Sequence, residues 1–167
     1  MKVETSRNKR ILVTGAAGFI GSHIVRGLLE LGFKEVYGID DFSGGYQSNL
    51  DQRMSGRFYT LDLRRRDYVR ELVNNIKPHI IYHLAANAGE GASMYQPQSS
   101  TDRNYLSFIN LLTPAIVAGI KKIILFSSMA VYGKGLNNPP FTEDMVRAPE
   151  DIYAVNKQAM ELSLQIE

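Results

Sequence analysis

Short apolar runs alternate along the chain with longer stretches that have helical apolar spacing. The apolar runs are bounded by polar or turn-forming residues, which is typical of buried strands; they lie at 11–13, 35–39, 57–61, 79–84 and 122–127. Helical spacing follows at 19–31, 67–76, 102–118 and 152–166. This alternation predicts an α/β fold, a doubly wound parallel sheet with helices on both faces.

Composition and charge narrow the class of protein. We expect one domain over 10–167, preceded by a polar, flexible arm at 1–10. The absence of cysteine excludes disulfides and cysteine metal sites and suits a cytoplasmic location, and three scattered histidines predict no metal site. The net charge of +2 is too small to favour binding to nucleic acid. The sequence contains no stretch of eighteen apolar residues, so no membrane span is predicted.

The segment Thr14–Gly21 joins the first strand to the first helix and contains three glycines. Gly15 can make the tight turn, Gly18 lets the backbone approach a phosphate, and Gly21 lets helix and strand pack closely. The helix N-terminus supplies free N–H groups and the positive end of its dipole. A Rossmann-type site for a dinucleotide pyrophosphate is therefore expected here.

Acidic and small residues follow the next strands. Asp40 lies nineteen residues after Gly21, where a carboxylate would bind the ribose hydroxyls and repel a 2′-phosphate, which favours NAD over NADP. Asp62 could bind the adenine amine with Leu63 against the ring, or it could simply start the next helix. The small residues of the segment 84–87 would let the chain pass close to the cofactor.

Tyr153 and Lys157 are four residues apart and share a face of the last predicted helix. A neighbouring ammonium favours the phenolate and lowers the tyrosine pKa, which makes the tyrosine a usable base near neutral pH. Ser128 ends the fifth strand, where its hydroxyl could hold the substrate oxygen. Taken alone, the Tyr/Lys spacing is far more typical of an amphipathic helix with a surface lysine.

Together these motifs resemble the extended short-chain dehydrogenase/reductase family, in its NAD-dependent epimerase/dehydratase branch, which acts on nucleotide sugars. The similarity runs from about residue 10 to the end of the chain. The matching residues agree in order and spacing; they are 14–21, Asp40, 62–63, 83–86, Asn104, 126–133, 140–144, Tyr153 and Lys157.

The resemblance implies a role for each matching residue. Tyr153 would be the general base and acid, Lys157 would bind the nicotinamide ribose, and Ser128, rather than Ser127, would bind the sugar hydroxyl. Asn104 would help to position the cofactor region, although it could be an ordinary polar residue at a helix start. The implied cofactor contacts are Gly15, Ala17, Gly18, Phe19, Ile20, Gly21, Asp40, Asp41, Phe42, Ser43, Asp62, Leu63, Leu84, Ala85, Ala86, Asn104, Tyr153 and Lys157.

The implied reaction is NAD-dependent epimerisation of a nucleotide sugar, with inversion at C4 through a keto intermediate. Met129 and Ala130 stand where dehydratases of the family carry acidic residues, which disfavours loss of water. The alternatives are a dehydratase or reductase of the same family and a non-catalytic NAD-binding module.

Family members normally continue with two more strands and a C-terminal lobe that binds the substrate. The chain is expected to be a portion of a longer protein, although a naturally short protein and half of a split enzyme are alternatives; turnover by the 167 residues alone is expected to be weak or absent. A homodimer through helices 102–118 and 152–166 is also expected. Its apolar face could equally be buried against the chain's own sheet; that face comprises Tyr105, Ile109, Leu112, Leu162 and Ile166.

Overall fold

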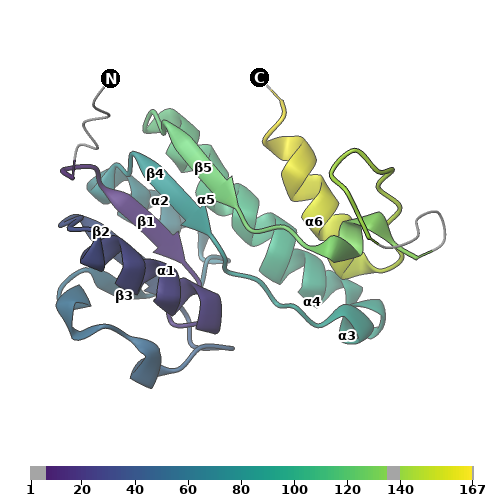
Figure 1. Cartoon of the computed structure of the whole chain (residues 1–167), viewed down its shortest axis with the longest axis horizontal. Coiled ribbons are helices and arrows are strands. Elements are labelled where there is room, and N and C mark those ends of the chain that lie inside the picture. Colours follow the sequence, from purple (N-terminus) through teal and green to yellow (C-terminus); the bar gives the residue numbers. More distant parts are fainter. Residues whose placement is uncertain (1–6, 135–139, 167) are drawn as a thin grey trace.

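A computed structural model describes residues 7–134 and 140–166 (Figure 1). Most of the arm expected at 1–10 lies outside the described residues. The centre of the fold is one parallel sheet of five strands in the order β3-β2-β1-β4-β5. The strands are β1 (Ile11–Thr14), β2 (Val36–Asp40), β3 (Phe58–Thr60), β4 (Ile80–His83) and β5 (Lys122–Leu125). The predicted parallel α/β sheet is confirmed.

The strand register aligns the carboxyl ends of the three central strands. Thr14 of β1 pairs with Ile39 of β2 on one side and with His83 of β4 on the other. His83 in turn pairs with Leu125 of β5. The segments that leave β1, β2, β4 and β5 therefore start from one edge of the sheet, where open α/β sheets bind their ligands.

Helices cover both faces of the sheet, as predicted for a doubly wound fold. The helix α1 (Phe19–Glu30) packs Val25 and Leu28 against the face formed by Ile11 and Val13 of β1. The helices α2 (Arg66–Ile76) and α5 (Ser107–Val117) pack on the opposite face, where Leu12 lies. The last helix, α6 (Ile152–Ser163), lies beyond β5 in Figure 1.

The segment between β4 and β5 differs from the sequence prediction. A short helix, α3 (Glu90–Tyr95), occupies part of the predicted loop. The long helix begins at 97 rather than 102, as α4 (Pro97–Thr101), and reaches α5 through the π-helical turn η3 (Asp102–Leu106). Proline fits the first turn of a helix because its missing N–H would have no partner there. The residues after Pro97 are polar and lack apolar helical spacing, so the sequence pattern did not predict a helix start there.

Smaller differences concern helix ends and short turns. The last helix ends at Ser163 rather than 166. Three short 3₁₀ turns interrupt predicted loops, η1 (Gln47–Asn49), η2 (Gln52–Met54) and η4 (Met129–Tyr132). Within residues 7–134 and 140–166, no helix has the length and apolar character needed to cross a membrane.

The apolar face proposed for a dimer is divided between the core and the surface. Leu112 is buried with Phe108 and Met160, and Tyr105 and Ile109 pack against the same cluster. Leu162 and Ile166 are exposed, at 53% and 80%. Burial against the chain's own fold therefore accounts for the α5 part of this face, while the homodimer stays a prediction.

Candidate functional site

The glycine segment makes the predicted tight turn after β1. Gly15 has a φ of +68°, a conformation that favours glycine. A Cβ atom at Gly15 would lie 2.8 Å from the Ala85 nitrogen, so the loop after β4 runs directly beside this turn. A Cβ at Gly21 would overlap the Gly15 carbonyl oxygen, so close packing of α1 on the turn requires glycine there.

The N-terminus of α1 is open to a ligand. Gly18 is its N-cap and supplies no side-chain hydrogen bond. The first N–H groups of a helix have no partner within the helix, and they concentrate positive potential at its start. Phe19 and Ile20 are 78% and 52% exposed. This cradle fits the diphosphate of a dinucleotide, because its donors are backbone amides and no side chain blocks them.

A groove of about 170 Å³ runs from this cradle along the carboxyl edge of the sheet. It brings together ten of the predicted cofactor residues: Gly15, Gly18, Asp40, Asp41, Ser43, Asp62, Leu63, Leu84, Ala85 and Ala86. Its remaining lining includes Arg64 and Asn87, together with two side chains that sequence reasoning did not single out, Arg103 and Ser107. Phe42 is not in this lining, and its ring lies 5.5 Å from that of Phe58.

Asp40 ties the glycine segment to the turn after β2. Its carboxylate oxygens accept hydrogen bonds from the Ala17 N–H at 3.0 Å and the Phe42 N–H at 2.8 Å. A carboxylate has about four acceptor positions, so positions remain for two ribose hydroxyls. The predicted ribose role of Asp40 is compatible with this arrangement.

The turn after Asp40 also clamps the glycine segment, a contact that sequence reasoning missed. The Ala17 carbonyl accepts hydrogen bonds from the Tyr46 N–H at 3.1 Å and from the Asn49 side chain at 2.8 Å. A Cβ atom at Gly45 would lie 2.7 Å from the Ala17 carbonyl carbon. The pair Gly44-Gly45 was the available sequence signal, since two adjacent glycines permit such a close approach.

Asp62, which was predicted to bind the adenine amine, is already paired within the groove. Its carboxylate forms a two-pronged pair with Arg64, whose Nη2 atom lies 2.6 Å from Oδ2. The hydrogen bond from Arg64 lowers the pKa of the Asp62 carboxyl, which therefore stays ionised. Since α2 begins at Arg66 with Arg65 as its N-cap, Asp62 does not start that helix. An adenine amine would share Asp62 with Arg64.

Asn104 holds the wall of the groove that follows β4. Its side chain accepts a hydrogen bond from the Asn87 N–H at 2.8 Å and donates one to the Asn87 carbonyl at 3.2 Å. Asn104 is fully buried within η3 and does not lie at a helix start. The same amide lies 3.4 Å from the Ser100 hydroxyl, which the Asn156 side chain of α6 also contacts at 3.4 Å. Hydrogen bonds therefore connect the groove wall to α6.

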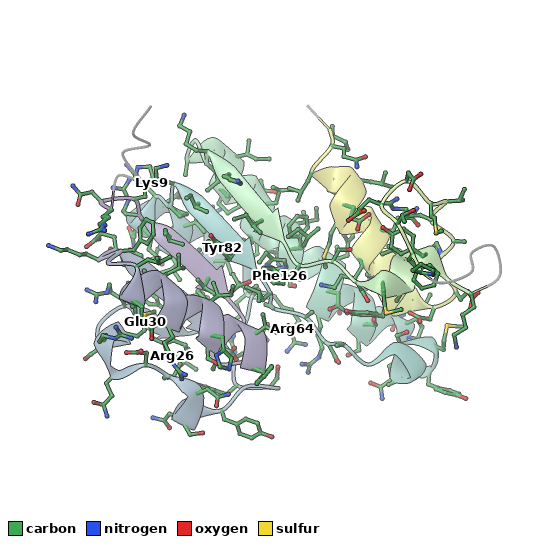
Figure 2. The ribbon with its side chains drawn as sticks, in the orientation of Figure 1. Lys9, Arg26, Glu30, Arg64, Tyr82 and Phe126 are labelled. Carbon is green, nitrogen blue, oxygen red and sulfur yellow. The ribbon has the colours of Figure 1, made fainter. Side chains whose placement is uncertain are left out.

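Lys157 lies past the carboxyl end of β5, with Tyr153 on the same helix, and neither residue lines this groove. The Lys157 Nζ atom donates to the Phe126 carbonyl at 2.7 Å, and the Phe126 N–H donates to the His83 carbonyl at the end of β4. The same Nζ atom is 5.8 Å from the centroid of the Tyr153 ring. Both side chains are buried, with 2% and 6% exposed. Figure 2 shows Phe126 and Arg64 beyond the strand arrowheads, with Lys9 at the opposite end.

The burial of Lys157 disfavours the charged form of its side chain. Burial lowers the pKa of Lys157 to about 8 from its ordinary value of 10.5. Lys157 uses one of its three donors on Phe126, which leaves donors for a ribose or a phenolate oxygen.

This burial predicts a pH dependence of stability. Between pH 8 and 10.5 the unfolded chain binds more protons at Lys157 than the folded chain, so this residue makes the free energy of unfolding rise by about 3 kcal/mol over that interval. We expect Lys157→Met to lack this rise, because methionine does not titrate. Urea unfolding of both proteins at pH 7.5 and 10.5 measures the difference, and parallel pH curves would contradict the burial of the ammonium.

Ser128 and Ser127 have different surroundings at the end of β5. Ser128 is the N-cap of η4, and its half-buried hydroxyl oxygen accepts a hydrogen bond from the Ala130 N–H at 3.2 Å. The exposed Ser127 donates to a Glu161 oxygen of α6 at 2.5 Å. Because the Ser127 hydroxyl is hydrogen-bonded to Glu161, Ser128 is the better candidate for contact with a substrate.

His83 is a buried neutral side chain beneath the site. Its Nδ1 atom lies 2.9 Å from the Thr14 hydroxyl, while Nε2 has no hydrogen-bond partner in the described part of the chain. Burial, with the nearby charge of Lys157, lowers the pKa of His83 to about 3. No cluster of potential metal ligands occurs within residues 7–134 and 140–166.

The chain is similar in sequence to known sugar epimerases. The UDP-glucuronate 4-epimerase of Thermodesulfobacterium geofontis is 33% identical over 160 residues, which cover 90% of this chain and 49% of that protein. The UDP-glucose 4-epimerase of Mycolicibacterium smegmatis is 37% identical over 161 residues, covering 94% and 50%. The chain thus spans about half the length of these relatives.

Solved structures agree with these relatives. The UDP-glucose 4-epimerase of Thermotoga maritima, solved with UDP-glucose, superposes with a TM-score of 0.87 at 32% identity, covering 93% of this chain and 50% of that one. The Thermus thermophilus enzyme, solved with NAD, gives 0.86 at 33% identity, covering 94% and 50%. A family model described as the NAD dependent epimerase/dehydratase family matches residues 11–166. The chain therefore belongs to this family, as the resemblance of its sequence predicted.

Proposed function

We propose that the chain is the cofactor-binding and proton-transferring portion of an NAD-dependent nucleotide-sugar epimerase that inverts C4 through a keto sugar. One observation carries the proposal. The buried Tyr153–Lys157 pair lies at the same sheet edge as a groove whose glycine turn and Asp40 suit a dinucleotide. The relatives named as UDP-sugar 4-epimerases support the choice of substrate and carbon.

Bound NAD would supply the hydride acceptor and donor for the sugar carbon. The chain's own residues would handle the proton. The Tyr153 phenolate takes the proton of the C4 hydroxyl as the carbonyl forms and returns it after the keto sugar has turned over. The Lys157 ammonium stabilises the phenolate, and the Ser128 hydroxyl donates a hydrogen bond to the sugar oxygen. No proton is gained or lost over the full cycle.

Loss of water from the sugar is not favoured by the residues beside Ser128. Dehydration needs a general acid for the departing hydroxyl. The neighbouring positions hold Met129, which is 68% exposed, and Ala130, and neither can donate a proton. The set of Ser128, Tyr153 and Lys157 favours an enzyme over a non-catalytic NAD-binding module.

Because the chain spans about half of its relatives' length, we propose that sugar-binding residues come from polypeptide outside these 167 residues. The function is tested by incubating the longest form of the protein expressed in its host with UDP-, dTDP- and GDP-sugars and reading products by NMR. The expected product is a C4 epimer without net NADH. A 4-keto-6-deoxy product, or accumulating NADH, would contradict epimerisation. The homodimer and the cytoplasmic location stay predictions.

The cofactor preference gives a sharper test at Asp40. We expect Asp40→Asn to weaken NAD binding by about 10-fold to 100-fold, because hydrogen bonds to a charged group are lost, and to narrow the preference for NAD over NADP. Asp67→Asn is the matched control, because Asp67 is an exposed carboxylate of α2 that pairs with Arg70 and does not line the groove. Calorimetric titration of both cofactors measures the change. Equal losses in the two variants would show that Asp40 does not recognise the ribose.

A further inference from the structure

Arg103 is a cation in the groove that the proposed reaction leaves without a role. Its side chain lines the groove from η3, together with Ser107 of α5. Within the described part of the chain its guanidinium makes no hydrogen bond or ion pair. The other lining arginine, Arg64, is committed to Asp62 on two prongs. Arg103 is therefore the lining guanidinium that is available to a ligand.

The neighbours of Arg103 locate it along the groove. The next residue, Asn104, grips Asn87, which follows Ala85 and Ala86 on the wall beside the glycine turn. Two helical turns later, the Asn110 amide donates to the Leu63 carbonyl at 3.1 Å, at the adenine end. Arg103 thus lies on the helical wall between these two points, near enough to Asp62 for its charge to lower the pKa of that carboxyl. A ligand that spans the groove from the α1 amides to Asp62 would pass Arg103.

The groove is lined by more carboxylates than cations, so an unpaired cation there would favour the binding of an anionic ligand. Three carboxylates line it, from Asp40, Asp41 and Asp62, against Arg64 and Arg103. Since Arg64 neutralises Asp62, removal of Arg103 would leave two lining carboxylates without a balancing lining cation. A dinucleotide diphosphate carries two negative charges, and a guanidinium fork matches the geometry of phosphate oxygens. A diphosphate held by backbone amides alone would be repelled by these carboxylates.

We propose that Arg103 binds the diphosphate of the dinucleotide, from the wall opposite the N-terminus of α1. The groove then closes on the diphosphate from two sides, with neutral amides on one and a cation on the other. This assignment rests on the proposed function, because it takes the ligand to be a dinucleotide. It makes Arg103 a determinant of preference for diphosphate-bearing ligands over the free nucleoside.

The test compares ligands with and without the diphosphate. Arg103→Met keeps most of the aliphatic stem and removes the charge; Arg103→Lys keeps a charge and removes the fork. Arg70→Met is the matched control, because Arg70 is an exposed arginine of α2 paired with Asp67 at 3.1 Å. NAD and ADP-ribose are titrated by calorimetry and adenosine by NMR, and urea midpoints confirm that each variant is folded.

We expect Arg103→Met to weaken both NAD and ADP-ribose about 10-fold to 100-fold, with Arg103→Lys in between, because a charge-assisted pair to phosphate is lost. Adenosine affinity should change less than about twofold on the same argument. The salt dependence of NAD binding should also become shallower in the methionine variant.

Two results would overturn the assignment. Equal weakening of adenosine and NAD would mean that Arg103 stacks on the adenine ring instead. Unchanged NAD binding in Arg103→Met, with normal binding by the unmodified chain, would remove Arg103 from the site while the proposed function stands. If the unmodified chain binds neither NAD nor ADP-ribose, the cofactor assignment is wrong, and the role of Arg103 that depends on it is wrong as well.

Discussion

Replacing Tyr153 with phenylalanine is expected to lower the kcat of epimerisation by about 10²-fold to 10⁴-fold, the usual contribution of a positioned general acid–base group. The ring would still fill its buried place on α6, since only the hydroxyl is removed. Lys157 would keep its bond to the Phe126 carbonyl. NAD affinity should therefore stay within about threefold, because the adenosine and diphosphate contacts lie elsewhere.

The measurement is steady-state epimerisation of the substrate found in the sugar panel, with NAD affinity measured separately by calorimetry. Tyr68→Phe is the matched control, since Tyr68 lies on α2 and is 60% exposed. It should keep full activity. A Tyr153→Phe enzyme that retains more than about a tenth of kcat would show that another group carries the proton, against the usual size of this effect.

Replacing Gly21 with alanine is expected to destabilise the fold by about 3 kcal/mol or more, at the upper end of overpacking effects. The new methyl group would overlap the Gly15 carbonyl oxygen and approach the Gly15 carbonyl carbon at 2.8 Å. Both atoms belong to the backbone, so no side chain can turn away to make room. Displacement of α1 would also open the diphosphate cradle, and NAD binding should be lost.

Gly27→Ala on the same helix is the matched control. A Cβ atom there would meet no atom within 4 Å, so alanine should stabilise the domain by about 0.5–1 kcal/mol through helix propensity. Urea unfolding followed by circular dichroism measures both variants. Equal midpoints for Gly21→Ala and the unmodified chain would mean that α1 does not pack on the glycine turn as described.

Much of the fold was predictable because it depends on local patterns. The buried strands follow from short continuous apolar runs and the helices from apolar spacing with a period of 3.6 residues, and the alternation of elements leaves few topologies. The region from Glu90 to Leu106 was harder. Its α3 helix is short, and its π-helical turn contains Asn104, whose hydrogen bond with Asn87 no local period encodes.

The candidate site was predictable where a backbone conformation demands one residue type. Gly15 and Gly21 are such positions, because a side chain at either would meet backbone atoms. The pairing of Asp62 with Arg64 and the half-buried Arg103, which makes no ion pair in the described part of the chain, were not predictable in the same way. Charged side chains choose among several partners, and that choice depends on distances across the fold.

By itself, the sequence determined the order of strands and helices, the glycine turn, the spacing of Tyr153 and Lys157, and the family resemblance that the comparisons confirm. Only the tertiary structure decided that Lys157 is buried against Phe126, that Asn104 holds Asn87, and that Arg103 stays free. The physical reason is the separation along the sequence between the residues that interact. Turns and helix faces depend on residues a few positions apart, whereas burial, ion pairing and pKa shifts depend on segments that meet only after the sheet has formed.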